Sequence, residues 1–166
     1  MREWSRGTKR ILTISSETET KMLGEALARC ARPPAFLGLT GPLGAGKTAL
    51  AQAFLRTLGV EGPIPSPTFL LARRYEKGPH RMVHMDFYRL AEGAPGDDVW
   101  IVEALEEADY AVVEWADRAP YLLPDEALLV TLRPLPGHPM GREVEAAFRH
   151  EKARTWWECA LKERGF

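Results

Sequence analysis

The sequence predicts a three-layer α/β domain, in which helices cover both faces of a mixed, mostly parallel β-sheet. Strand-like and helix-like segments alternate in the first half of the chain, which is typical of a parallel sheet. Two short apolar runs are typical of strands that are buried on both faces. Strand pairs elsewhere indicate antiparallel additions to the sheet. The 166 residues suit one compact domain, and no repeat or linker divides them, so residues 1–166 are expected to fold as one unit.

The first expected strand and helix lie before a pair of prolines. Residues 10–15 are expected to form a short strand, and Ser16 with Glu19 forms a possible capping box for the helix that follows. Apolar side chains recur on one face of this helix, and Pro33-Pro34 ends it.

A buried strand, a glycine-rich turn and a second helix come next. The apolar run Ala35–Thr40 predicts the buried strand. After the turn, Leu50, Phe54 and Leu58 recur every four residues, and Gly59 is placed to end the helix.

The rest of the chain adds strands in pairs and ends with an amphipathic helix. The expected elements are a strand pair at residues 68–76 and 80–90 with a turn at 77–79, a helix at 99–108, a buried strand at 110–115, a strand pair at 128–135 and 142–150 with a turn at 136–141, and a terminal helix at 151–165.

Composition and charge are those of an ordinary globular protein. The chain is 45% hydrophobic and 27% charged, with a formal net charge of −1, which gives no support for a strongly basic nucleic-acid binder. No apolar run approaches the ~20 residues that a membrane span needs. The charged start of the chain lacks the apolar core of a signal peptide. We therefore expect a cytoplasmic protein without membrane contact.

The two cysteines, Cys30 and Cys159, have no C-x-x-C or histidine spacing near them. They predict two structural thiols in a reducing compartment and argue against a metal site. The chain also has no asparagine, a single glutamine and 13 prolines. Few thermolabile amides and many prolines are typical of a thermophile, although a GC-rich genome gives a similar bias.

The stretch GPLGAGKT, Gly41 to Thr48, fits the phosphate-loop pattern G-x-x-x-x-G-K-[ST] between a buried strand and a helix. Glycines let the backbone curl so that successive N–H groups point inward, where they and the start of the helix stabilise polyphosphate charge. We expect ATP and Mg²⁺ as cofactors, with Lys47 at the β- and γ-phosphates and the Thr48 hydroxyl on the metal. The expected nucleotide contacts in this stretch are Gly41, Leu43, Gly44, Ala45, Gly46, Lys47, Thr48 and Ala49.

Two carboxylates, Asp86 and Glu114, lie toward the carboxyl ends of expected strands. Ligands of α/β proteins bind at the carboxyl ends of strands. We therefore expect both residues to be catalytic and metal-binding, one serving Mg²⁺ and the other orienting or activating the attacking water. The sequence leaves open which does which, and a surface carboxylate is the alternative at either position.

Several other side chains have two interpretations each. Thr68, in the proline-rich stretch 66–69, is expected to reach Mg²⁺ or the γ-phosphate, or else to belong to a proline-braced start of a strand. Trp115 stacks on a ligand or partner, or fills the core. Arg89 pairs with phosphate or a partner, or is an exposed arginine. His84 has no metal-ligand companion at useful spacing and is expected to be an ordinary strand histidine.

Four separated motifs, GPLGAGKT, SPTF, HMDFYRL and VEW, occur in the order seen in the bacterial TsaE ATPases, also called the YjeE family. The chain resembles this family over nearly its whole length. The resemblance implies a P-loop NTPase fold and an ATPase that acts with Mg²⁺. It also implies support of the TsaB–TsaD pair in the threonylcarbamoyladenosine modification of tRNA, with tRNA contacted only indirectly.

The resemblance also implies roles for individual residues. It places Lys47 and Thr48 at phosphate and Mg²⁺, Thr68 in a switch loop, Asp86 on the metal side, Glu114 in hydrolysis and Trp115 near the nucleotide.

The sequence departs from the family pattern at two places. Pro42 stands where the family often has Asp, and residues 92–98 match poorly, so no function is carried onto them. A small-molecule kinase and a binding module with negligible turnover remain alternatives.

Overall fold

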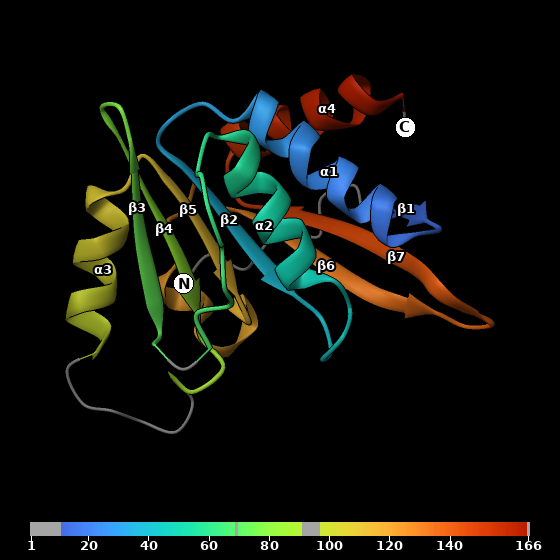
Figure 1. Cartoon of the computed structure of the whole chain (residues 1–166), viewed down its shortest axis with the longest axis horizontal. Coiled ribbons are helices and arrows are strands. Elements are labelled where there is room, and N and C mark those ends of the chain that lie inside the picture. The colour runs from blue at the N-terminus through green and yellow to red at the C-terminus, as the bar shows by residue number, and fades with distance from the viewer. Residues whose placement is uncertain (1–10, 69, 91–96, 166) are drawn as a thin grey trace.

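The computed structural model describes residues 11–68, 70–90 and 97–165. It contains a seven-stranded sheet in the order β1-β7-β6-β2-β5-β4-β3, with helices on both faces (Figure 1). The strands are β1 Ile11–Ile14, β2 Ala35–Thr40, β3 Ala72–Lys77, β4 His80–Asp86, β5 Tyr110–Glu114, β6 Leu128–Leu135 and β7 His138–Phe148. The helices are α1 Glu17–Cys30, α2 Lys47–Thr57, α3 Asp97–Glu107 and α4 Glu151–Arg164, with short 3-10 helices at Ala116–Arg118 and Pro120–Leu122.

The centre of the sheet is parallel and its flanks are antiparallel. Strands β6, β2, β5 and β4 run parallel to one another, whereas β3 pairs with β4, β7 with β6, and β1 with β7 in the antiparallel sense. This arrangement confirms the expected mixed α/β sheet with added strand pairs. In the register of the sheet, Asp86 of β4 lies opposite Glu114 of β5. The two candidate carboxylates therefore share one edge of the sheet.

Two hydrophobic clusters fill the space between the sheet and its helices. Helices α1, α2 and α4 pack on one face, where Leu27, Phe54 and Trp156 belong to the same buried cluster (Figure 1). Helix α3 and the 3-10 helices cover the other face, around Phe87 and Ile101. Among the described residues, no helix is both long and apolar enough to cross a membrane.

Local signals in the sequence predicted most element boundaries. The Glu19 N–H donates to Ser16 Oγ over 3.1 Å, as expected of an N-cap. The Glu19 carboxylate, however, accepts from Ser15 and not from the Ser16 N–H, so the capping box is incomplete. Strand β3 begins at Ala72 and not at 68, because Leu71, directly before it, has a left-handed backbone conformation with φ of 66°.

The hairpin between β6 and β7 is tighter than expected. Strand β7 begins at His138, so the turn is Pro136–Gly137 and most of the expected turn at 136–141 is strand. Pro139 has no N–H to donate, and it is tolerated because residues 139–141 lie in the register shift between Pro134 and Leu135 and pair with neither β6 nor β1.

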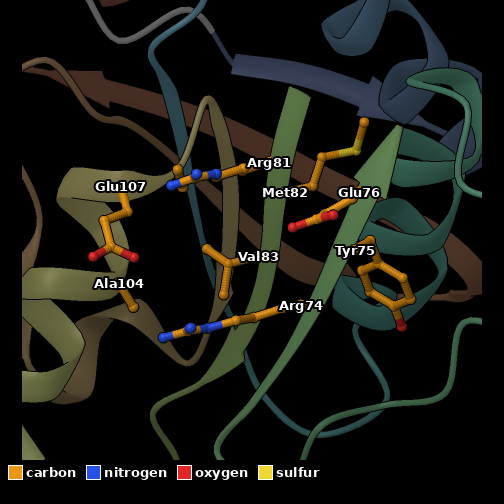
Figure 2. A pocket seen from close by; sticks show the side chains of 9 residues that line it. Arg74, Tyr75, Glu76, Arg81, Met82, Val83, Ala104 and Glu107 are labelled. Carbon is orange, nitrogen blue, oxygen red and sulfur yellow. The ribbon is translucent and has the colours of Figure 1, made fainter. Parts of the chain in front are cut away.

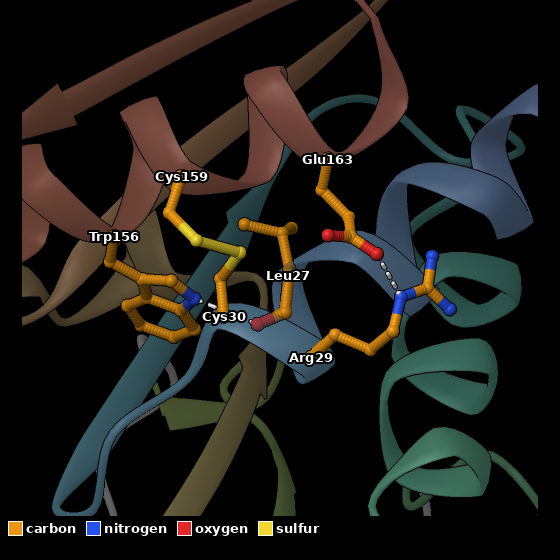
Figure 3. Close-up of a disulfide and its surroundings, with 6 residues drawn as sticks. All are labelled: Leu27, Arg29, Cys30, Trp156, Cys159 and Glu163. Atoms are coloured by element: carbon orange, nitrogen blue, oxygen red, sulfur yellow. Dashed lines mark hydrogen bonds and ion pairs between the residues drawn. A yellow bond between two sulfur atoms is a disulfide. The ribbon is translucent and has the colours of Figure 1, made fainter.

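The expectation of two free thiols is wrong, because Cys30 and Cys159 form a disulfide between α1 and α4 (Figure 3). Their Cα atoms are 5.9 Å apart, although 129 positions separate them in the chain. The same helices are joined by a hydrogen bond of 2.8 Å from Trp156 Nε1 to the Leu27 carbonyl. The pairing follows from the packing of α4 on α1, which cysteine spacing alone cannot indicate.

Candidate functional site

The phosphate-loop motif forms a tight loop between β2 and α2. Gly46 is the N-cap of α2, has φ of 107° and contributes no side-chain cap. The first N–H groups of a helix have no partners within it, so the start of α2 is open to an anion. The helix also carries no acidic side chain in its first turn. The start of α2 therefore presents backbone donors without an acidic side chain of its own.

Lys47 lies beneath the loop and is almost completely buried. Its Nζ donates to the carbonyls of Gly41 and Pro42, at 2.6 and 2.8 Å. The same nitrogen lies 4.0 Å from the centre of the Trp115 ring. Burial lowers the pKa of Lys47, and the negative charges of Glu114 and other nearby carboxylates oppose this shift. The site therefore holds a partly desolvated ammonium group beside the loop.

Glu114 is the central carboxylate of the site. Its Oε1 accepts a 2.6 Å hydrogen bond from Thr48 Oγ1, and its Oε2 lies 2.6 Å from Nε2 of His84. Both Glu114 and His84 are buried. A carboxylate only accepts hydrogen bonds, so the Nε2–H tautomer of His84 is the one that fits. The contact with Thr48 links the candidate catalytic carboxylate directly to the expected metal ligand.

His84 was missed as a site residue by sequence reasoning, which treated it as an ordinary strand histidine. His84 and Asp86 are two positions apart on β4 and therefore face the same side of the sheet, which is the side covered by α2. Glu114 faces the same side from β5. The two-residue spacing in HMD was the only sequence signal, and it is meaningful only once β4 and β5 are known to be neighbours.

Asp86 receives two hydrogen bonds in its buried position. Its Oδ2 accepts from Thr68 Oγ1 at 3.0 Å, and its Oδ1 accepts from the backbone N–H of Tyr88 at 2.8 Å. The Thr68 hydroxyl also lies 2.8 Å from Ser66 Oγ. The hydroxyl pair of the proline-rich segment is thus attached to Asp86, while Phe69 lies outside the described residues.

Most of the expected site residues line one cleft of about 550 Å³. The expected residues in its lining are Leu43, Gly44, Ala45, Gly46, Lys47, Thr48, Ala49, Thr68, Asp86, Glu114 and Trp115. Four further lining residues that the sequence did not indicate are Glu17, Thr20, Met140 and Arg142. Gly41 does not line this cleft; it lines a neighbouring cleft of about 540 Å³ with Trp115 and Asp117. Arg89 is exposed and lines neither cleft.

Trp115 lines both clefts and has an unusual backbone conformation. Its φ and ψ are 55° and 38°, the left-handed region that bulky residues rarely adopt. The Tyr88 ring lies edge-on at 4.9 Å, and the Arg118 guanidinium lies 5.5 Å from the Trp115 ring centre. Together with Lys47, these groups hold the indole against the phosphate loop.

A third, small cavity of about 120 Å³ lies between β3, β4 and α3 (Figure 2). Arg74, Arg81 and Glu107 project around it in Figure 2, and its lining shares no residue with the two larger clefts. This cavity is therefore separate from the candidate site.

The donors in the large cleft fit Mg²⁺. Within the described ranges, no three His, Cys, Asp or Glu side chains come together as a complete metal cage. Mg²⁺ is usually bound by one or two carboxylates together with waters and substrate phosphates, so a complete cage is not required. Thr48, Asp86 and Glu114 supply the hard oxygen atoms that this ion prefers.

A buried strand, a phosphate loop and a helix, with carboxylates at the ends of two neighbouring strands, define a P-loop NTPase fold. The chain belongs to the TsaE family: the family model described as "Threonylcarbamoyl adenosine biosynthesis protein TsaE" matches residues 14–142.

Relatives from several bacteria carry the name tRNA threonylcarbamoyladenosine biosynthesis protein TsaE. The Bacillus subtilis relative is 34% identical over 121 residues, which cover 73% of this chain and 75% of the relative. The Treponema pallidum relative is 32% identical over 120 residues, covering 72% and 88%. The crystal structure of YdiB from Bacillus subtilis superposes with a TM-score of 0.76 and 25% identity, covering 95% of this chain and 97% of YdiB.

Proposed function

We propose that this chain is a Mg²⁺-dependent ATPase of the cytoplasm that supports a TsaB–TsaD complex in the threonylcarbamoyladenosine modification of tRNA, with no direct role in contacting tRNA. Family membership supports the pathway, because the relatives are named for the biosynthesis of this modification. The hydrolytic activity is supported by one observation above all. Glu114, a buried carboxylate at the cleft, is hydrogen-bonded to Thr48 directly after the phosphate loop.

The loop and Lys47 would bind the phosphates. Backbone N–H groups and the Lys47 ammonium would stabilise the charge that develops on the phosphate oxygens as the terminal phosphoryl group is transferred to water. In the structure, Lys47 Nζ donates to two loop carbonyls. Nucleotide binding would draw the ammonium from these carbonyls toward the β- and γ-phosphates.

Thr48, Asp86 and Glu114 would hold the metal, which supplies neutralisation of phosphate charge. A hydroxyl has one donor and two acceptor lone pairs, so Thr48 can donate to Glu114 while its lone pairs face a cation. Glu114 would orient the attacking water and accept its proton. His84 would hold Glu114 in place through Oε2.

Thr68 would link the nucleotide site to the binding of the partner complex. Its hydroxyl donates to Asp86, and the segment that carries it leads into β3. Hydrolysis would remove the γ-phosphate and reorder this segment, which would change the affinity for the partner complex.

The test is to combine the purified chain with TsaB and TsaD and to measure phosphate release and modified tRNA over repeated cycles. We expect stimulated phosphate release and sustained modification. The variant Glu114→Gln should bind ATP without hydrolysing it. Sustained modification by this variant would indicate a nucleotide-dependent binding module, and the absence of any complex or stimulation would contradict the proposal.

One observation favours a second candidate, a small-molecule kinase. The neighbouring cleft at Gly41 and Trp115 has room for a second substrate, and Asp117 at its wall is a possible base for an acceptor hydroxyl. A panel of hydroxylated metabolites incubated with Mg²⁺ and ATP separates the candidates. A phosphorylated product would support the kinase, whereas free phosphate alone would support the ATPase.

A further inference from the structure

Arg142 reaches the phosphate loop from a distant part of the chain. Its backbone lies in β7 between two other strands, opposite Ile14 of β1 and Pro134 of β6. Its side chain lines the large cleft. The sheet therefore fixes the base of this side chain more firmly than a loop would.

The Arg142 guanidinium donates hydrogen bonds to four backbone carbonyls. Nε donates to Ala45 at 2.8 Å, and Nη2 donates to Gly44 at 3.1 Å. Nη1 donates to Pro139 and Gly141, at 3.0 and 2.7 Å. One planar group thus joins the middle of the phosphate loop to the tip of the β6–β7 hairpin.

These contacts determine which way two peptide groups of the loop face. In a trans peptide, the C=O of one residue and the N–H of the next point in opposite directions. The carbonyls of Gly44 and Ala45 face Arg142, so the N–H groups of Ala45 and Gly46 point away from it. The Ala45 N–H is used within the loop, where it donates to the Pro42 carbonyl at 3.1 Å. The Gly46 N–H is therefore the inward donor that these contacts direct toward phosphate.

The same hairpin supports the start of the loop. Gly41 has φ of 137°, and a Cβ at this position would collide with the carbonyl group of Leu132 in β6. The loop backbone is therefore packed directly on β6 at its first residue and held by Arg142 at its middle. The hairpin therefore contacts the loop at two places, Gly41 and the Gly44–Ala45 carbonyls.

We propose that Arg142 is a positioning residue for nucleotide binding, which holds the loop carbonyls outward so that the loop is preorganised for polyphosphate. This inference rests on the proposed function, because it takes the loop to bind the phosphates of ATP. The role needs the planar fork of arginine. Lysine keeps the positive charge but cannot span carbonyls on both the loop and the hairpin.

The experiment compares Arg142→Ala and Arg142→Lys with the control Arg133→Ala. Arg133 lies on β6 of the same hairpin, and its guanidinium forms an exposed ion pair of 2.9 Å with Glu145. Calorimetric titration with Mg-ADP gives the dissociation constant and the stoichiometry for each. We expect both Arg142 variants to bind about 10- to 100-fold more weakly with unchanged stoichiometry, because the binding groups are misplaced. Arg133→Ala should bind as the wild-type chain does.

Steady-state phosphate release adds a second readout. A misplaced loop would weaken binding of the ground state and of the transition state to the same extent. KM would then rise, and kcat at saturating ATP would stay nearly unchanged. A merely structural loss would lower the active fraction, and therefore kcat and the stoichiometry, without this selective rise of KM.

Wild-type affinity in Arg142→Ala would overturn the inference. Wild-type affinity in Arg142→Lys would overturn it as well, because charge alone would then suffice. If the thermal melt shows that Arg142→Ala does not fold, the comparison of Arg142→Lys with Arg133→Ala decides. A wild-type chain that binds no nucleotide would contradict the proposed function itself, and this inference would fall with it.

Discussion

His84 Nε2 and Glu114 Oε2 lie 2.6 Å apart on the adjacent parallel strands β4 and β5. Both side chains are buried on the α2 side of the sheet. Since Thr48 donates to the other oxygen of Glu114, each oxygen of this carboxylate has a partner. The orientation of Glu114 therefore depends on His84 as well as on Thr48 of the phosphate-loop motif.

Replacing His84 by alanine should misplace Glu114 and leave a buried carboxylate oxygen without its donor. We expect the free energy of unfolding to fall by about 1–3 kcal/mol, with a loss of phosphate release. His84→Gln can place an amide N–H near the position of Nε2 and should recover much of both. Urea denaturation and a phosphate-release assay measure these effects. Equal losses in the two variants would contradict the role assigned to the hydrogen bond.

Replacing Glu114 by glutamine keeps the size of the side chain and an acceptor for Thr48, but removes the group that can take a proton. We expect kcat for ATP hydrolysis to fall by about 10²- to 10⁴-fold. The dissociation constant for Mg-ATP should change little. Single-turnover hydrolysis and equilibrium binding separate the two quantities. Full activity in this variant would move the role of base to another residue, with Asp86 as the first candidate.

The fold and the phosphate loop could be predicted because their signals are local. A buried apolar run, a glycine turn and a four-residue periodicity lie within residues 35–58, and they specify β2, the loop and α2. The partners of Glu114 could not be predicted in the same way. His84 and Thr48 lie 30 and 66 positions from it, and only the order of β2, β5 and β4 brings them together.

The disulfide and the Arg142 contact were beyond prediction for the same reason. Cys30 meets Cys159 across 129 positions, and Arg142 meets Ala45 across 97. Such contacts depend on how α4 and the β6–β7 hairpin pack on the rest of the chain. A single sequence carries no periodicity that reports this packing.

Replacing Tyr75 by phenylalanine should reduce the loss of stability at high pH. Burial raises the pKa of Tyr75 above its ordinary value of 10.0, against the opposing charges of Arg73 and Arg56. Above pH 10 the unfolded chain releases this proton while the folded chain retains it, so stability falls as pH rises. Tyr75→Phe has no hydroxyl proton to release, so its stability does not fall for this reason. Moreover, the buried Tyr75 hydroxyl has no hydrogen-bond partner among the described residues, so its removal should cost little at pH 7.

Urea denaturation of wild type and Tyr75→Phe at pH 8 and pH 10.5 checks this expectation. Tyr121→Phe is the matched control, because Tyr121 is 63% exposed. The advantage of Tyr75→Phe over wild type should grow with pH, whereas Tyr121→Phe should follow wild type. A pH-independent difference would contradict the effect of burial.

Removing the disulfide should lower stability without weakening nucleotide binding. Cross-links of this kind typically contribute about 2–4 kcal/mol. We therefore expect Cys159→Ser to lower the free energy of unfolding by about this amount, and Mg-ADP affinity to stay unchanged, since neither cysteine lines the large cleft. Thermal melts with and without reductant measure the first effect, and the serine variant should be insensitive to reductant. Mass spectrometry that found two alkylatable thiols in the untreated native chain would contradict the bond.

The pairing of Asp86 with Glu114 across β4 and β5 has a consequence for the way this chain can vary. Because successive side chains of a strand alternate between faces, a one-residue insertion within β4 or β5 would turn one carboxylate toward α3 and leave the other under α2. Length changes that preserve activity should therefore fall outside the stretches 82–86 and 110–114. The β3–β4 turn at Gly78 lies upstream of the paired stretch. A residue inserted there would leave both carboxylates on the same face of the sheet.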